Sequence, residues 1–586
     1  MSENPKNKFD YYLFKRVIKL ARPYRPIMWL AVVLAVILAP LATQRPNLIM
    51  KMVDDHIYTG DFDGMGQLVM LLFGLLFAET IFRYLFIYYA NLLGQSVIYD
   101  LRVRVFKHIT RLRLTYFDRT PIGTSTTRTI NDIETINNIF SQGVITIMAD
   151  LLTIIFVLGF MFMASWQLTL ICLTTLPLLV IATYIFKENV KKAFQIVRTQ
   201  ISKMNAFLQE RISGMRIVQI FNAEEQEASK FKSINREYTQ ANLDSILYYA
   251  VFYPVVEILS AASLGLMVWW GAGGVINDTV SLGALVAFPI YLNMLFRPVR
   301  TLADNFNTLQ MGLVAAERVF SILDRDDIID NSGKIEVKEL KGDIEFKHVD
   351  FSYVVNEPVL KDLSFSLNAG ETLAIVGGTG SGKSTIVNVL NRFYPLNGGQ
   401  ILVDGHPYES YELSHYRNRI GMVLQDVFLF SGSVMENITL RDERFTKEEV
   451  IAASKLIGAH PFLEKLPGGY DYQVMERGAT LSKGQRQLIS FVRALIFDPD
   501  VLILDEATSS IDPETEAVIQ TAIEKLIDKR TSIIIAHRLS TIRHADNILV
   551  LEKGEIAELG THEELLLLED GHYRGLYDMQ FLETID

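Results

Sequence analysis

Residues 373–390 read LAIVGGTGSGKSTIVNVL. A strand-like apolar run leads into a glycine-rich loop and then an amphipathic helix, which matches G-x-x-x-x-G-K-[ST] in the strand–loop–helix setting that this motif requires. The glycines let backbone N–H groups curl around a phosphate, and the helix N-terminus adds a positive dipole. The alternative, a flexible glycine loop with no ligand, does not account for the whole motif. The stretch therefore predicts a phosphate-binding loop in an α/β domain.

The loop motif also assigns roles to its residues. Lys383 is expected to reach the β- and γ-phosphates of a nucleotide, and Ser384 is expected to supply an oxygen to Mg²⁺. The residues predicted to bind the nucleotide here are Gly377, Gly378, Thr379, Gly380, Ser381, Gly382, Lys383, Ser384 and Thr385.

Two later strand-like runs end in residues suited to phosphate chemistry. The run in DVLILDEATSSIDPETE (500–516) ends in Asp505 and Glu506. Because ligands bind beyond the carboxyl ends of parallel strands, we expect Asp505 to bind Mg²⁺ and Glu506 to polarise an attacking water. The run in TSIIIAHRLST (531–541) ends at His537, which we expect to contact the γ-phosphate. An acidic pair that merely begins a turn is the weaker interpretation beside this loop.

Length and composition indicate several domains, one of them in a membrane. The chain has 586 residues, of which 49% are hydrophobic, and its formal net charge is -11. The negative charge disfavours a nucleic-acid partner, which basic surfaces usually attract. The single cysteine, Cys172, lies in an apolar run and is expected to pack there. The N-terminal stretch has no short apolar segment followed by a small-residue cleavage site, so no signal peptide is expected.

The first half of the chain contains apolar runs long enough to cross a bilayer, which takes about 20 residues each. Six candidate spans are 27–50, 66–94, 141–163, 166–187, 247–274 and 281–306. The expected fold is a six-span α-helical transmembrane domain with long cytoplasmic stalks, fused to an α/β P-loop nucleotide-binding domain. The predicted boundaries are 1–325 for the membrane domain, 326–340 for a linker and 341–586 for the nucleotide-binding domain.

Loop charge predicts the orientation of the spans. Lysine and arginine residues precede the first span and are frequent in 95–140 and 188–246, whereas the loop DDHIYTGDFDG has four aspartates and neither lysine nor arginine. Both termini are therefore expected in the cytoplasm. The two basic segments read as helical hairpins whose tips are 117–128, with Pro121 and Gly123 as breakers, and 211–227, with Gly214. A surface turn and a docking contact that transmits motion are the two interpretations of these tips.

Ionisable residues within the spans are costly and are therefore candidates for function. They are Arg45, Glu79, Arg83, Asp150, Glu257, Arg297 and Asp304. Glu79 and Arg83 are spaced i,i+4 and are suited to a structural pair. Arg45 and Glu257 have no local partner, so they are better candidates for lining a water-filled cavity.

These motifs together resemble an ATP-binding cassette (ABC) exporter half-transporter, over roughly residues 15 to 578. The resemblance implies ATP and Mg²⁺ as cofactors and adds several site residues. Tyr353 in DFSY matches the aromatic residue that stacks on adenine, and Gln425 in MVLQDVFLF matches the glutamine that senses Mg²⁺ and water. Asp512 in SSID matches a dimer-interface residue, and Glu476 in ERG lies where the partner's cytoplasmic loops make contact. The hairpin tips match coupling helices.

One motif departs from the family pattern. The signature L-S-G-G-Q, which faces the ATP bound to a partner chain, reads LSKGQ here, in which Ser482, Gly484 and Gln485 are retained and Lys483 replaces a glycine. Lys483 is expected to force another backbone geometry, to point at the nucleotide, or to turn to solvent. Because the chain's own phosphate-loop site looks complete while its signature is altered, the resemblance favours a heterodimer with a second ABC half-transporter chain.

The expected function is ATP-driven export of an amphipathic or hydrophobic small substrate (drug, lipid or peptide) by alternating access. The expected surroundings are membrane lipid in a bacterial inner membrane. A homodimeric exporter or lipid flippase is the first alternative, and an ATP-gated channel or regulatory protein is the second.

Overall fold

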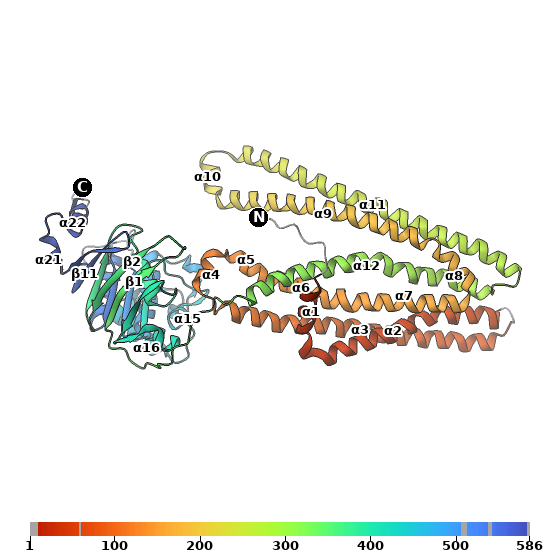
Figure 1. Cartoon of the computed structure of the whole chain (residues 1–586), viewed down its shortest axis with the longest axis horizontal. Coiled ribbons are helices and arrows are strands. Elements are labelled where there is room, and N and C mark those ends of the chain that lie inside the picture. The colour runs from red at the N-terminus through yellow and green to blue at the C-terminus, as the bar shows by residue number, and fades with distance from the viewer. Residues whose placement is uncertain (1–9, 58–59, 506–512, 537–541, 583–586) are drawn as a thin grey trace. The chain divides into compact units, whose positions relative to one another are not determined.

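The computed structural model describes residues 10–57, 60–505, 513–536 and 542–582. The chain forms two compact units (Figure 1). The first comprises Met1–Thr110 with Thr120–Asp326, and the second comprises Arg111–Arg119 with Asp327–Asp586. A short segment from the first half of the sequence therefore folds with the second unit.

The described part of the first unit is helical. Its α-helices are α1 (Tyr11–Leu20), α2 (Arg25–Lys51), α3 (Phe62–Ile109), α5 (Ile122–Thr127), α6 (Ile133–Asn138), α7 (Ile145–Ala164), α8 (Trp166–Leu173), α9 (Leu176–Ser213), α10 (Met215–Ile220), α11 (Glu224–Ile276) and α12 (Leu282–Leu323). Shorter helical turns are η1 (Arg22–Tyr24), η2 (Met52–Ile57), η3 (Arg128–Asp132) and η4 (Ile139–Val144); the last three are π-helical.

Among the described residues, five helical segments are long and apolar enough to cross a membrane. They are Arg22–Ile57, Phe62–Ile109, Ile122–Ala164, Trp166–Ser213 and Glu224–Ile276, and a shorter apolar stretch, Leu282–Pro298, lies within α12. Five long segments and a sixth shorter one agree with the predicted six-span helical domain. The 53-residue helix α11 is about 80 Å long at 1.5 Å per residue. It therefore extends far beyond a hydrocarbon core of about 30 Å.

The predicted hairpin tips coincide with breaks between helices. Helices α9 and α11 run side by side and are joined through α10 (Figure 1). The break at Gly214 separates α9 from α10, as predicted. In the first hairpin Pro121 precedes α5, but Gly123 lies within that helix. The prediction that Gly123 breaks the chain is wrong, because a glycine inside a helix only weakens it unless the fold needs another conformation.

The predicted ionisable and apolar positions of the first unit have specific surroundings. Arg83 donates a 2.6 Å hydrogen bond to Glu79, which confirms the pair. Asn305 donates to Asp150 at 3.2 Å. Cys172 is fully buried and packs in the core, as expected. Arg45 is half-buried, whereas Glu257, Arg297 and Asp304 are exposed; that Arg45 and Glu257 line a cavity stays a prediction.

The second unit contains three sheets. The antiparallel sheet has the order β2 (Leu360–Leu367), β1 (Ile344–Phe351), β4 (Gly398–Val403), β5 (His406–Pro407). The six-stranded sheet has the order β12 (Glu555–Gly560), β11 (Asn547–Glu552), β3 (Thr372–Val376), β10 (Thr531–Ile535), β9 (Val501–Asp505), β6 (Ile420–Val423). A small pair joins β7 (Gly432–Ser433) to β8 (Gln473–Val474).

Helices surround the sheets of the second unit. They are α4 (Leu114–Arg119), α13 (Lys383–Leu390), α14 (Leu413–Asn418), α15 (Val434–Thr439), α16 (Lys447–Ile457), α17 (His460–Lys465), α18 (Lys483–Ile496), α19 (Pro513–Ile527), α21 (His562–Leu566) and α22 (His572–Leu582). Three 3-10 turns are η5 (Tyr408–Ser410), η6 (Gly469–Asp471) and η7 (Glu476–Gly478).

Strand β3 shows why this sequence forms the centre of the sheet. All five of its residues are buried. Ala374 and Val376 face one hydrophobic core, and Leu373 and Ile375 face the other. Alternate residues of a strand point to opposite faces, so an unbroken apolar run is what a strand covered on both sides requires. The strand then delivers the glycine loop to the carboxyl edge of the sheet.

Candidate functional site

The phosphate loop connects β3 to α13, and its backbone depends on glycine. Gly377, Gly380 and Gly382 have φ values of 149°, 81° and 109°, a region that side-chain-bearing residues rarely adopt. A Cβ on Gly377 would come within 2.2 Å of the carbonyl oxygen of Leu551, whereas one on Gly380 would meet nothing within 4 Å. The loop therefore packs closely against Leu551 at Gly377 and leaves open space at Gly380.

Two side chains of the loop have geometry that fits a bound phosphate. Lys383 is 8% exposed, and its ammonium donates to the carbonyl oxygens of Gly377 at 2.7 Å and Gly378 at 2.9 Å. The Oγ atom of Ser381 is buried and has no hydrogen-bond partner among the described residues. Ser384 is exposed at the first turn of α13. A phosphate would satisfy the buried hydroxyl and attract the lysine, so these residues fit the triphosphate of a nucleotide.

Parallel strands bring the predicted acidic residue to this loop. Asp505 ends β9 and pairs in register with Ile535 of β10, which in turn pairs with Ile375 of β3. Burial lowers the pKa of Lys383, and the negative charge of Asp505 acts in the opposite direction. The phosphate loop and Asp505 therefore lie at the same edge of the sheet.

Tyr353 stands beside the start of α13. Its hydroxyl lies 3.4 Å from the hydroxyl of Thr385 and accepts a 3.1 Å hydrogen bond from Asn388. Its ring meets Phe351 edge-on at 4.8 Å and Tyr394 at 5.0 Å between ring centroids. An aromatic ring held by two others next to a phosphate loop is suited to stacking on a purine base.

The other predicted residues are partly described. Gln425 is exposed just after β6, whose carboxyl end lies on the same edge of the sheet as that of β9. Glu476 begins η7, and its carboxylate lies 4.0 Å from Arg477. Glu506, Asp512 and His537 were predicted from the sequence and lie outside the described residues.

The LSKGQ motif forms an ordinary helix start. The hydroxyl of Ser482 accepts a hydrogen bond from the backbone N–H of Gln485 at 3.2 Å, and the Gln485 side chain accepts one from the backbone N–H of Ser482 at 3.0 Å. Lys483 is the half-buried first residue of α18, and Gly484 is buried. This reciprocal capping box excludes the expectation that Lys483 forces another backbone geometry. The other two expectations, that the Lys483 side chain contacts the nucleotide or turns to solvent, stay predictions.

The segment 111–119 forms a contact that the sequence did not predict. Its backbone pairs with the linker, because Arg113 N–H donates to Asp327 and Ile329 N–H donates to Arg111, both at 3.0 Å. Arg119 donates to the carbonyl oxygen of Tyr353 at 3.2 Å. Arg119, the last residue of this segment, therefore contacts the backbone of the predicted adenine-stacking residue.

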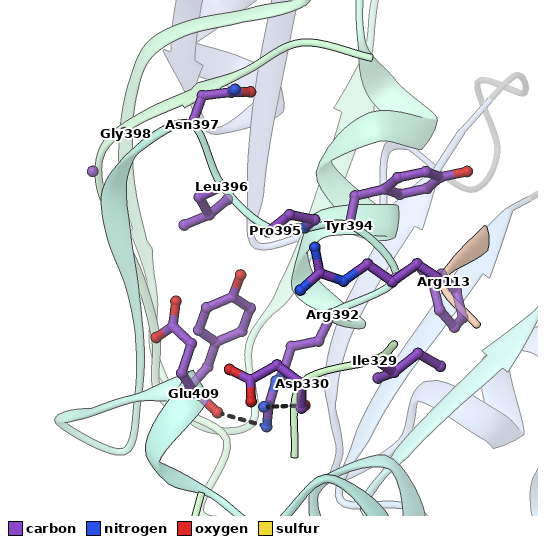
Figure 2. Close-up of a pocket in the computed structure, with 13 residues that line it drawn as sticks. Arg113, Ile329, Asp330, Arg392, Tyr394, Pro395, Leu396, Asn397, Gly398 and Glu409 are labelled. Atoms are coloured by element: carbon purple, nitrogen blue, oxygen red, sulfur yellow. Dashed lines mark hydrogen bonds between the residues drawn. The ribbon is translucent and has the colours of Figure 1, made fainter. Parts of the chain in front are cut away.

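A pocket of about 350 Å³ lies beside this contact (Figure 2). Arg113, the linker residue Asp330 and the loop 393–399 contribute to its lining. Arg392 is 8% exposed, and it donates to the carbonyl oxygens of Tyr408 at 3.2 Å and Asp330 at 3.1 Å. The buried guanidinium thus joins the linker to the nucleotide-binding domain. In the sequence, the single feature that could have pointed to Arg392 is the presence of an arginine within an apolar stretch.

Comparisons with known proteins agree with this geometry. A family model described as "ABC transporter transmembrane region" matches residues 28–299, and one described as "ABC transporter" matches residues 360–509. The chain is 39% identical over 584 residues to the uncharacterized ABC transporter ATP-binding protein YknV of Bacillus subtilis, which covers 99% of this chain and 96% of that protein.

Two further relatives have more specific names. The probable multidrug resistance ABC transporter ATP-binding/permease protein YheH of Bacillus subtilis is 39% identical over 532 residues, which covers 90% of this chain and 78% of YheH. An ATP-dependent lipid A-core flippase of Syntrophus aciditrophicus is 36% identical over 572 residues, which covers 97% of this chain and 95% of the flippase.

Proposed function

Since the chain belongs to the ABC transporter family as an integral-membrane exporter half-transporter that binds and hydrolyses ATP, we propose that it works as one half of a heterodimer. Its own phosphate loop and Asp505 assemble into one site, whereas its signature carries Lys483. An ATP site in this family combines the phosphate loop of one chain with the signature of the other. The single observation behind the heterodimer is this combination of an intact loop with a substituted signature.

We assign the site residues as follows. The nucleotide is bound by Tyr353, residues 377–385 and, from the facing chain, the elements equivalent to Ser482, Lys483, Gly484, Gln485 and Asp512. Glu506 is the general base, with His537 and Gln425 at the γ-phosphate. Mg²⁺ held by Ser384, Gln425 and Asp505 neutralises phosphate charge. The burial of Lys383 and the unpartnered hydroxyl of Ser381 support this assignment.

Exposed apolar side chains support a partner chain. Around α10, Ile217, Ile220 and Phe221 are exposed, and on the second unit Phe430 and Met475 are exposed. Apolar groups gathered on a protein surface commonly mark an interaction site. We assign α10 as the coupling helix that docks on the nucleotide-binding domain of the partner, near Gln425 and Glu476.

In the proposed transport cycle, the long helices transmit motion from the nucleotide-binding domains to the membrane cavity. The two nucleotide-binding domains close on ATP, the cytoplasmic hairpins convey the closure, and the membrane cavity turns from inward- to outward-facing. Hydrolysis with Glu506 as the base then resets the cycle. The proposed cargo is an amphipathic or hydrophobic compound, as the relatives' names for multidrug export and lipid A-core flipping indicate. The proposed location is a bacterial inner membrane with both termini in the cytoplasm.

The oligomer is tested by comparing ATP hydrolysis by the purified chain alone with that of the chain co-expressed with a candidate partner. We expect low turnover alone and a large increase with the partner. Robust turnover by the chain alone, unchanged by Lys483→Gly, would overturn the heterodimer. Export is tested in inside-out vesicles, where ATP-dependent accumulation supports a pump. Nucleotide-dependent conductance without hydrolysis would instead support a channel.

A further inference from the structure

A cavity of about 270 Å³ lies in the first unit, whereas the residues assigned to the nucleotide belong to the second. It is lined by Gly123, Thr124, Thr127, Arg128, Asp132 and Arg318. Thr124, Arg128 and Asp132 are spaced four residues apart along α5 and the π-helical turn η3, so they lie on one helical face. Arg318 comes from α12, which packs against η3. The cavity therefore lies between the first cytoplasmic hairpin and the last long helix.

Asp132 is the distinctive group in this cavity. It is 6% exposed, and its Oδ1 accepts a 3.0 Å hydrogen bond from Nη1 of Arg318. Its Oδ2 is buried and has no hydrogen-bond partner among the residues that the structure describes. A buried carboxylate oxygen without a partner is unfavourable. It is therefore placed to accept a hydrogen bond from something that enters the cavity.

The remaining polar groups favour an anion. Arg128 is half-buried and forms no ion pair within the described part of the chain, and the side chain of Arg318 is 50% exposed. The nearby Glu134 is directed to another partner, since its carboxylate lies 3.4 Å from Arg102. Guanidinium groups bind phosphate through paired N–H donors. The ligand must therefore carry negative charge to bind the two arginines. It must also carry a proton that it can donate to the carboxylate of Asp132.

We propose that this cavity binds a phosphate group that retains a hydroxyl, either inorganic phosphate or a phosphate monoester. Its charged oxygens accept from Arg128 and Arg318, and its P–O–H donates to Oδ2 of Asp132. Sulfate and phosphate diesters are excluded because neither carries that proton at neutral pH, so their oxygens would face the carboxylate unpaired. The cavity volume is several times the roughly 30 Å³ that one water takes up in the liquid, which leaves room for the group.

The bound phosphate would connect η3 to α12 by contacting an arginine on each. The ligand has two possible sources, a phosphate ion in the cytoplasm or a phosphomonoester lipid headgroup such as that of phosphatidic acid. Unlike the phosphate loop, this site is expected to require a ligand that donates a P–O–H proton. Comparing phosphate with sulfate therefore distinguishes this site from the phosphate loop.

The test uses the full-length transporter with a saturating non-hydrolysable ATP analogue, which fills the phosphate loop. Calorimetric titration with inorganic phosphate should show binding, and titration with sulfate should show affinity lower by about tenfold or more, the size of one charge-assisted hydrogen bond. Asp132→Asn should bring the phosphate-to-sulfate ratio close to one, because an amide donates as well as accepts. Arg128→Gln should weaken phosphate binding by about tenfold or more.

Arg104→Gln is the matched control, since it removes an exposed arginine of α3 that does not line the cavity and should leave phosphate affinity unchanged. The lipid source is tested in nanodiscs that contain phosphatidic acid or phosphatidylglycerol, a diester. Preference for phosphatidic acid without affinity for the free ion identifies a headgroup site. Equal affinity for phosphate and sulfate, wild-type binding by Arg128→Gln, or no binding of ion and headgroup would each overturn the proposal. Arg318→Gln replaces Asp132→Asn if that variant fails to fold.

Discussion

The hydroxyl of Tyr394 donates a 2.6 Å hydrogen bond to Oδ2 of Asp118, although 276 residues separate them in the sequence. Tyr394 is buried, and its ring stands edge-on to that of Tyr353 at 5.0 Å. Burial and the bond to Asp118 both raise the pKa of Tyr394, so the phenol keeps its proton at neutral pH. The segment 111–119 is thus joined to the aromatic group that we assign to adenine.

We expect Tyr394→Phe to uncouple transport from hydrolysis. The change removes a hydrogen bond to a charged group, which is worth about 1.5–3 kcal/mol, but it keeps the ring that packs on Tyr353. Transport should fall several-fold while ATP affinity stays near that of the wild type. Transport and ATPase assays on the same vesicles check this. Tyr411→Phe is the control, because its hydroxyl donates to Val403 within the nucleotide-binding domain. Unchanged transport by Tyr394→Phe would contradict the coupling role.

We expect Ser482→Ala and Thr446→Ala to lower stability alike but to differ in activity. Both residues cap a helix through a capping box, at α18 and α16, and loss of such a cap costs about 1 kcal/mol. Only Ser482 belongs to the signature, so only Ser482→Ala should reduce ATP hydrolysis by the complex with its partner. Thermal unfolding and ATPase rates measure the two effects. Equal ATPase loss in both variants would make the role of Ser482 purely structural.

We expect Arg83→Gln to destabilise the membrane domain strongly. Glu79 is 6% exposed, and Arg83 is its hydrogen-bonded partner at 2.6 Å. Arg83 itself is 47% exposed, but its removal leaves the buried Glu79 carboxylate without its charged partner, which costs about 1–3 kcal/mol. The double variant Glu79→Gln with Arg83→Gln should recover most of the loss. Arg102→Gln, which breaks an exposed pair with Glu134, should cost less than about 1 kcal/mol. Thermal unfolding in detergent measures all three.

We expect Gly377→Ala to disrupt the phosphate loop and Gly378→Ala to leave it intact. A Cβ on Gly377 would overlap the carbonyl oxygen of Leu551 at 2.2 Å, and its φ of 149° disfavours a side chain. A Cβ on Gly378 would meet nothing within 4 Å, and Gly378 has no left-handed φ. ATP binding should be lost in the first variant and retained in the second. Nucleotide binding by Gly377→Ala at wild-type affinity would refute the assigned backbone constraint.

Local patterns in the sequence predicted much of this molecule. The run 373–390 contains its own strand, loop and helix start, so Lys383 could be placed without any distant contact. The Glu79–Arg83 pair was equally predictable, because both residues lie on one turn of one helix.

Contacts between distant segments could not be predicted in this way. Nothing in LTYFDR indicates that Asp118 meets Tyr394, since that contact depends on how the segment 111–119 packs with residues far along the chain in the second unit. The cavity at Asp132 depends likewise on Arg318 from α12. Lys483 is an intermediate case, because its motif was visible while its helical backbone followed only from the capping bonds around it.

The discontinuous second unit has a consequence for biosynthesis. Leu112 and Tyr116 are almost fully buried, and they belong to a segment that groups with Asp327–Asp586. The ribosome synthesises this segment long before the residues that cover it. These apolar side chains therefore stay unburied until those residues are made. Only a chain whose first hairpin has emerged on the correct side of the bilayer can bury them. We expect a chain inserted with the first hairpin on the other side of the bilayer to leave these apolar side chains exposed.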